Sequence, residues 1–146
     1  MVEEADKSFP NESGGVLMGY WVSDSELVIT DAIGPGPNAL HTPFSFVPDS
    51  NYHEISIAEI YQTSGRLHSY LGDWHNHTNE RTVLSLKDKR TLFRIARSKT
   101  ARAPNPIMAI LGKSDEWVAS IWLLSPWLLW DRKVGWTTHD LNVKVY

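Results

Sequence analysis

The apolar residues of this chain fall into short runs separated by polar turns, a pattern typical of a domain built from strands and helices. We predict strands over residues 14–22, 26–33, 68–74, 107–112 and 117–124, with an edge strand over 135–146. The runs at 14–22 and 107–112 are almost continuously apolar, as in strands covered on both faces. Polar turns follow both runs, so each strand is expected to pair antiparallel with the next one.

Two helices are predicted from the residues that would cap them. Asp49 precedes a helix over 52–64, and Gly65 ends it because glycine readily takes the backbone conformation of a helix C-terminus. Ser85 caps a second helix, which is expected to end near 99–102, where prolines follow. The basic residues of this second helix are interpreted as complementing its dipole and as a solvated face, with an acidic partner as the alternative.

The remaining segments carry weaker patterns. Residues 1–11 form either a frayed lead-in or the remnant of a helix, and residues 40–48 an extended segment. Gly14 and Gly15 let the backbone run close to another group, which we interpret as the metal site or a substrate strand. Together these elements predict a single α/β domain over residues 1–146, with a mixed sheet and helices on both of its sides.

Candidate chemistry is concentrated between Trp74 and Asp88. His75 and His77 are two residues apart at the end of a predicted strand, so their imidazoles point the same way. Asp88 lies in the first turn of the following helix, three residues after Ser85, and the two share a helix face. Two nitrogen ligands and one carboxylate, with a fourth position left open, are typical of a catalytic zinc rather than a structural one.

Each of these features also has a plainer interpretation. A single His-x-His pair is common without a metal, the helix dipole alone favours Asp88, and capping alone accounts for Ser85. The metal site is favoured because the features occur together. The other histidines, which lack such spacing, are interpreted as surface or core residues: His41, His53, His68 and His139.

Composition excludes several classes of protein. The chain has no cysteine, which rules out disulfides, thiol nucleophiles and thiolate zinc sites. The net charge of −3, with no run of Lys and Arg forming a basic patch, gives no sign of a nucleic-acid partner. The apolar run at 121–130 contains a proline and is too short to cross a bilayer, and residues 1–11 do not read as a signal peptide. We therefore expect a soluble protein of the cytoplasm.

The motif His75-x-His77, seven residues, Ser85, two residues, Asp88, together with Glu12 in a Glu-Ser-Gly-Gly context, resembles the JAMM metalloproteases, also called MPN-plus or JAB domains. The resemblance implies a three-layer, cytidine-deaminase-like fold and one zinc per chain. It implies that His75, His77 and Asp88 ligate the zinc, that Glu12 is the general base, and that Ser85 stabilises the oxyanion. Thr78 departs from the proline that the family usually has after the second histidine.

The same resemblance implies a function. The most similar branch is the small bacterial JAB proteins that accompany ubiquitin-like conjugation genes, including those of antiphage defence. An isopeptidase or peptidase that cleaves after the C-terminal glycine of a ubiquitin-like modifier is expected, with activating and conjugating enzymes encoded nearby. Two alternatives stay open: a peptidase acting on a small sulfur-carrier-type protein, and a non-catalytic scaffold. The tryptophans at 127–130 are interpreted first as core and second as a homodimer or partner surface.

Overall fold

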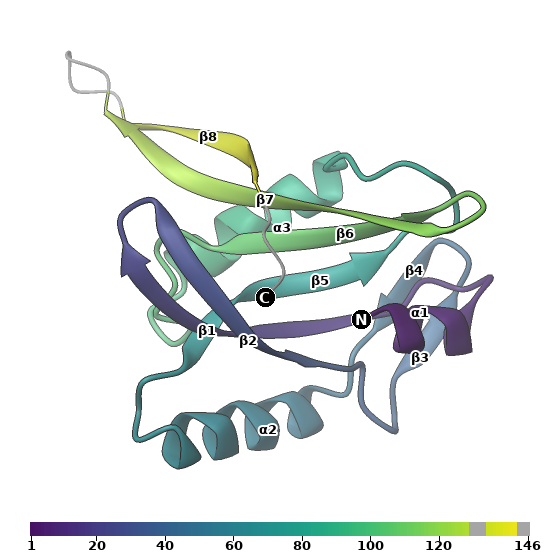
Figure 1. Ribbon diagram of the computed structural model, residues 1–146, viewed down its shortest axis with the longest axis horizontal. Coiled ribbons are helices and arrows are strands. Elements are labelled where there is room, and N and C mark those ends of the chain that lie inside the picture. The colour runs from purple at the N-terminus through teal and green to yellow at the C-terminus, as the bar shows by residue number, and fades with distance from the viewer. Residues whose placement is uncertain (129–133, 143–146) are drawn as a thin grey trace.

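A computed structural model describes residues 1–128 and 134–142, without the side chains of 126–128, 134–137 and 139. These residues form a curled sheet with helices on both of its faces (Figure 1). The elements along the chain are α1 (Val2–Ser8), β1 (Gly14–Ser23), β2 (Glu26–Ile33), β3 (Leu40–Thr42), β4 (Ser45–Val47), α2 (Ser50–Thr63), β5 (Ser69–Asn76), α3 (Leu86–Arg97), β6 (Ile107–Lys113), β7 (Trp117–Leu128) and β8 (Val134–Leu141).

The main sheet has six strands in the order β2-β1-β5-β6-β7-β8. Neighbouring strands run antiparallel except β5 and β6, which are parallel and are joined through α3. Parallel strands need such a crossover because the chain must return to the same end of the sheet. β5 therefore lies in the middle of the sheet, and its C-terminal end meets the start of α3.

The pleat of the sheet assigns its residues to two layers. Direct strand partners place Val16, Asp73 and Met108 in one row, so they face the same side. This face packs against α2 and α3 through two clusters, which contain Val16, Met18, Ile33, Leu92, Met108, Ile110 and Leu124. The opposite face packs against Ala5 of α1 through Leu17, Leu71, Trp74, Ile107, Ala109, Leu111 and Ile121. The predicted α/β class, with a mixed sheet flanked by helices, is confirmed.

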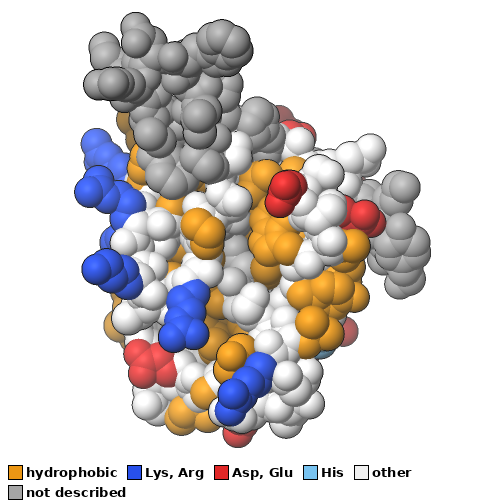
Figure 2. Space-filling model, turned by 90° about the vertical axis from the view of Figure 1, so that its left-hand side faces the viewer, with side chains coloured by type: hydrophobic (Ala, Val, Ile, Leu, Met, Phe, Trp, Pro, Cys, Tyr) orange, Lys and Arg blue, Asp and Glu red, His pale blue; other side chains and the backbone are white. Residues whose placement is uncertain are grey.

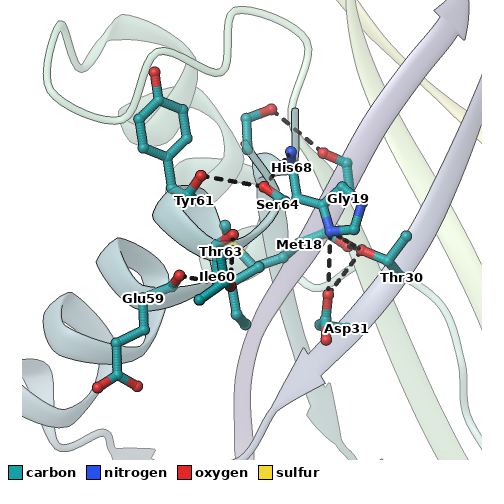
Figure 3. Close-up of polar contacts among 11 residues, drawn as sticks. Met18, Gly19, Thr30, Asp31, Glu59, Ile60, Tyr61, Thr63, Ser64 and His68 are labelled. Carbon is teal, nitrogen blue, oxygen red and sulfur yellow. Dashed lines mark hydrogen bonds and ion pairs between the residues drawn. The ribbon is translucent and has the colours of Figure 1, made fainter. Parts of the chain in front are cut away.

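Both predicted helix caps are present. The Asp49 side chain accepts the backbone N–H of Tyr52, and α2 ends at Thr63, followed by Gly65 with a φ of 67°. The end of α2 is tied to the sheet by polar contacts (Figure 3). The Ser64 hydroxyl accepts the backbone N–H of His68, and the His68 ring lies 3.0 Å from the Thr30 hydroxyl on β2.

The other histidines with described side chains have structural partners. His41 Nδ1 lies 2.9 Å from the Glu12 carbonyl oxygen, and His53 Nε2 lies 2.8 Å from that of Gly34. Together with the contact of His68, these hydrogen bonds confirm the surface or core interpretation for three of the four residues. The side chain of His139 lies outside the description.

Several segment boundaries differ from the prediction. Residues 2–8 are helical, residues 40–47 form the small hairpin β3–β4, and α3 ends at Arg97 because Ser98 is extended, with a ψ of 117°. The predicted edge strand is present as β8, while the tryptophan side chains at 127–130 and residues 143–146 lie outside the description. No helix in the described ranges is long and apolar enough to cross a membrane.

Candidate metal centre

The end of β5 presents two imidazoles to the same side. His75 is a buried residue of β5, paired with Gly14 of β1 and Ile110 of β6. β5 ends at Asn76, but the backbone N–H of His77 still donates to the Leu111 carbonyl at 2.7 Å, which keeps the chain extended for one more residue. The alternation of an extended chain therefore applies to both rings, and their Nε2 atoms lie 3.1 Å apart.

The carboxylate of Asp88 reaches the same point from α3. Ser85 and Asp88 form a capping box, in which Ser85 Oγ accepts the Asp88 N–H at 3.2 Å and Asp88 Oδ2 accepts the Ser85 N–H at 2.8 Å. These reciprocal bonds fix the Asp88 rotamer. Its Oδ1 lies 3.5 Å from His75 Nε2 and its Oδ2 lies 4.0 Å from His77 Nε2.

Three predicted ligand residues are thus brought together: His75, His77 and Asp88 offer donor atoms that all lie within 4.8 Å of one another. Within residues 1–128 and 134–142 this is the one group of three or more such side chains. Two imidazole nitrogens and one carboxylate oxygen form a donor set that fits Zn²⁺ and leaves room for one more ligand.

Hydrogen bonding and burial prepare the two rings as ligands. His77 Nδ1 lies 2.6 Å from the Arg81 carbonyl oxygen, which can only accept, so this nitrogen carries the proton and Nε2 offers a lone pair. Burial lowers the pKa of His75 to about 4, against the opposing charge of Asp88. A neutral imidazole is the form that binds a metal, so His75 is available as a ligand at neutral pH.

Glu12 lies just before β1 and lines a hollow that His77 also lines. The hollow has a volume of about 440 Å³ and is lined by Glu12, Pro43, Phe44, His77, Thr78, Asn79, Arg81, Val83, Leu84 and Ser85. Burial raises the pKa of the Glu12 carboxyl, while the nearby His77 and Lys87 pull it down. The backbone N–H of Glu12 donates to the Thr42 carbonyl at 2.8 Å, which ties this residue to β3.

Asn76 is a positioning residue that sequence reasoning missed. Its side chain is fully buried, with Oδ1 accepting the Ser13 N–H at 2.6 Å and Nδ2 donating to the Asn11 carbonyl at 3.2 Å. These bonds hold the residues on either side of Glu12 against the end of β5. Strand alternation turns Asn76 away from His75 and His77, into the core. A primary amide at a position predicted to be buried is unusual, and this could have indicated the positioning role from the sequence.

Gly14 and Gly15 allow a close approach between β1 and the segments around it. A Cβ on Gly14 would lie 2.3 Å from the Trp74 carbonyl oxygen and 2.4 Å from Phe46 Cζ, and one on Gly15 would lie 1.9 Å from the Ile33 carbonyl oxygen. The glycines therefore bring β1 close to its neighbours, and Gly14 is the direct strand partner of the candidate ligand His75. This close approach sets the distance between Glu12 and the end of β5.

Two histidines at the end of β5, an aspartate of α3 and a nearby glutamate thus lie together on a curled mixed sheet, an arrangement that suits a metal-dependent hydrolase. Residues 1–124 match the family described as prokaryotic homologs of the JAB domain. The chain belongs to this family.

Named relatives agree with the class. The chain is 39% identical over 125 residues to a probable metalloprotease, y4qB, of Sinorhizobium fredii (strain NBRC 101917 / NGR234), covering 84% of this chain and 76% of that protein. It is 27% identical over 107 residues to a CD-NTase/cGAS isopeptidase of Vibrio cholerae, covering 73% of this chain and 65% of the relative. An isopeptidase of the same name from Escherichia coli is 29% identical over 108 residues, with the same two coverages.

A solved structure supports the fold. The solution structure of protein DSY2949 from Desulfitobacterium hafniense aligns with 99% of this chain and 86% of its own, with a TM-score of 0.56 at 19% identity. The family and the named relatives support a peptidase-type hydrolase, and the donor set of the three clustered side chains indicates a metal ion.

Proposed function

We propose that this protein is a zinc-dependent isopeptidase or peptidase that cleaves after the C-terminal glycine of a ubiquitin-like modifier, in deconjugation or precursor processing. The observation that carries the proposal is the convergence of His75, His77 and Asp88. One of them, His77, lines the same hollow as Glu12 and Ser85. In this proposal residues 1–146 are one catalytic domain that acts in the cytoplasm.

The metal ligands are His75, His77 and Asp88, one zinc per chain. Zinc bound there supplies an acidified water and a polarised substrate carbonyl. The chain supplies the rest of the chemistry. His77 is held in one tautomer by the Arg81 carbonyl, and Asp88 is held in one rotamer by the capping box. Ligands that are fixed before the metal arrives bind it with less loss of side-chain freedom.

Glu12 is the proton carrier in this scheme. Its carboxylate takes a proton from the attacking water as the oxygen of that water bonds to the scissile carbonyl carbon. It then gives this proton to the leaving amine nitrogen as the C–N bond breaks. The raised pKa of Glu12, caused by burial, suits both transfers, because a base whose pKa lies nearer neutrality also returns the proton readily.

Ser85 is the donor to the oxyanion. Its Oγ already accepts the Asp88 N–H, and the hydroxyl hydrogen is left free to donate. A hydroxyl whose oxygen is fixed by a backbone contact is oriented before the reaction, which is the condition for stabilising a developing negative charge.

The substrate class is proposed from the relatives and the shape of the site. Two relatives carry the name CD-NTase/cGAS isopeptidase, which supports an isopeptide bond between proteins as the target and a role in antiphage defence. The hollow is open and its walls include Phe44 and Val83, which are exposed and apolar. Such a surface suits an extended C-terminal tail, with activating and conjugating enzymes as functional neighbours.

A cleavage assay tests the proposal. Purified protein loaded with zinc is incubated with a ubiquitin-like protein fused through its C-terminal glycine to a reporter, and separately with a small carrier protein bearing an amino acid on a Gly-Gly tail. Cleavage of the fusion that is lost with a chelator and with Glu12→Gln supports the proposal. Cleavage of the carrier conjugate alone would assign the protein to sulfur-carrier chemistry, and a zinc-loaded protein inert on both would be a scaffold.

A further inference from the structure

The outer face of α3 carries a line of positive charge. Lys87, Arg90, Arg94 and Arg97 are spaced three, four and three residues apart, which places them on one side of the helix. All four are exposed, and the opposite side buries Asp88, Leu92 and Ile95. We call the four residues the basic stripe; at the rise of a helix it is about 15 Å long. Figure 2 shows Lys and Arg side chains along the left-hand edge of one face of the molecule, with others near the lower centre of that face.

The segment that contains the basic stripe is positively charged, whereas the rest of the chain is negatively charged. Residues 81–102 contain eight of the 14 basic residues but only one of the 17 acidic ones, Asp88, so this segment carries +7 and the remainder −10. No salt bridge between described residues involves any of the four stripe residues. The net charge of −3 therefore conceals a local basic patch. From the sequence, this helix is expected to carry a solvated basic face, with an acidic partner as the alternative, but no basic patch is expected.

The helix dipole does not account for the whole stripe. Arg94 and Arg97 lie in the last turn, where a cation is stabilised. Lys87 lies in the first turn, where the dipole disfavours a cation, and Arg90 lies too far from the C-terminus to gain from it. Neighbouring like charges three and four residues apart also repel one another. Among the described residues, Asp73 attracts Arg94 and Glu12 attracts Lys87. Arg90 and Arg97 form no salt bridge with a described residue, so these two are the part of the stripe best placed to meet a partner.

Apolar side chains accompany the stripe. Leu86 is 74% exposed and Phe93 is 37% exposed, and spacings of four and three residues place both beside Arg90 on α3. Basic groups interleaved with exposed leucine and phenylalanine fit a protein segment that offers carboxylates and apolar side chains. A nucleic acid is disfavoured, because the remainder of the chain carries −10 and repels an extended polyanion.

The stripe also begins at the metal centre. Lys87 lies two residues after Ser85 and directly before Asp88, so a protein whose scissile bond lies over the candidate ligands has α3 immediately beside it. We propose that the outer face of α3 is a docking surface for an acidic, leucine-containing segment of the protein substrate. This inference rests on the proposed function for the identity of the partner as a substrate, but not for the binding itself.

Binding is tested without any catalysis. Fluorescence anisotropy measures a short fluorescein-labelled peptide in which Glu alternates with Leu, against the zinc-loaded protein. We expect binding that weakens as salt rises to about 0.3 M, and that falls about fivefold in Arg90→Glu and in Arg97→Glu. Lys89→Glu is the matched control, since Lys89 is exposed on the same helix but lies off the stripe. Arg90→Gln removes the charge without reversing it, so we expect a smaller loss of peptide affinity. A graded effect of this kind shows that the loss in Arg90→Glu does not come from misfolding.

Several results would overturn the docking surface. These are absence of peptide binding, an equal loss in Lys89→Glu and Arg90→Glu, equal binding of a peptide with Gln in place of Glu, or tighter binding of a single-stranded DNA oligonucleotide of similar length. An effect shared by Lys89→Glu would mean that the net charge matters and the stripe does not.

A kinetic comparison separates this inference from the proposed function. Two fluorogenic peptides share a glycine-ending tail, and only one carries the acidic segment. We expect Arg90→Glu to raise KM for the acidic peptide about fivefold and to leave kcat, and both constants of the plain peptide, unchanged. If both peptides are cleaved alike by all variants, docking is wrong and the function stands. If neither is cleaved while the anisotropy result holds, the function is wrong and docking stands.

Discussion

The buried amide of Asn76 links two parts of the site that are far apart in the sequence. It holds the backbone of Asn11 and Ser13, and through them Glu12, against the strand end that carries His75. Its effect on catalysis is indirect, because none of its hydrogen bonds in this structure is to a candidate ligand.

Replacing Asn76 by Ala is expected to cost about 2–3 kcal/mol of unfolding free energy, because the buried Ser13 N–H loses its acceptor and a cavity remains. Urea unfolding measures this change, and activity should fall while zinc content is retained. Asn11→Ala is the control, since the Asn11 group that Asn76 contacts is a backbone carbonyl. Equal losses in the two variants would contradict the positioning role.

Glu12 and His77 have separable roles in the proposed mechanism. Glu12→Gln keeps the shape of the side chain but cannot carry a proton, so we expect full zinc content with kcat reduced about 10²-fold or more. His77→Ala removes a ligand, so both zinc and activity should be lost. Metal analysis by mass spectrometry beside a cleavage assay checks both variants. Zinc lost in Glu12→Gln, or kept at full stoichiometry in His77→Ala, would reverse the assignments.

At the scale of elements, α3 begins with a structural cap and also completes the site. The Ser85 cap and the proposed oxyanion contact use different parts of one hydroxyl, the oxygen lone pair and the hydrogen. The two roles can therefore be separated by choosing side chains that keep only one of them.

Ser85→Gly keeps a residue that is tolerated at the N-cap but has no side-chain donor, so unfolding free energy should change by less than about 0.5 kcal/mol while kcat falls about 10–10²-fold. Ser85→Ala should lose about 1 kcal/mol as well as activity, and Ser85→Thr should retain both. Thermal unfolding and a cleavage assay are run on the same preparations. If Ser85→Gly cleaves as fast as the wild type, Ser85 acts as a cap alone.

Local signals explain which elements could be predicted. Asp49 and Ser85 cap their helices through side chains three residues from their backbone partners, so both helices could be predicted from sequence. α1 has no side-chain cap at Met1, and its start carries no such signal. The candidate ligands share a short motif, whereas the partners of Asn76 lie 63 and 65 residues away, a separation that only the fold closes.

At the scale of the whole molecule, the charge distribution was the least predictable property. The formal net charge averages over the chain, and helical spacing is needed to see that Lys87, Arg90, Arg94 and Arg97 lie in one line. The order of the main sheet likewise depends on long-range pairing, although each of its six strands was predicted from its own run of residues. Patterns within a few residues therefore specified the elements, while their assembly defined the surfaces.

Stability should depend on pH through His75. Its pKa is about 4 in the fold and 6.5 as the reference for the unfolded chain, so between these values the unfolded state binds more protons. The contribution of neutral His75 to the free energy of unfolding is therefore complete above about pH 6.5 and is lost as pH falls toward 4. Urea midpoints of zinc-free protein across this range should fall more steeply for the wild type than for His75→Gln. Parallel pH profiles would contradict a buried neutral imidazole.

The connection between β5 and α3 has one more consequence. His77 and Asp88 are joined by a stretch of only ten intervening residues, 78–87, so an ion held by both clips that stretch into a closed ring. A clip of this kind restricts the ring far more than it restricts the sheet, whose strands hold one another independently. Chelation should therefore speed amide hydrogen exchange in 78–87 first, while β1 and β6 keep their protection. Exchange that quickened evenly across the chain would mean that the ion maintains the whole architecture.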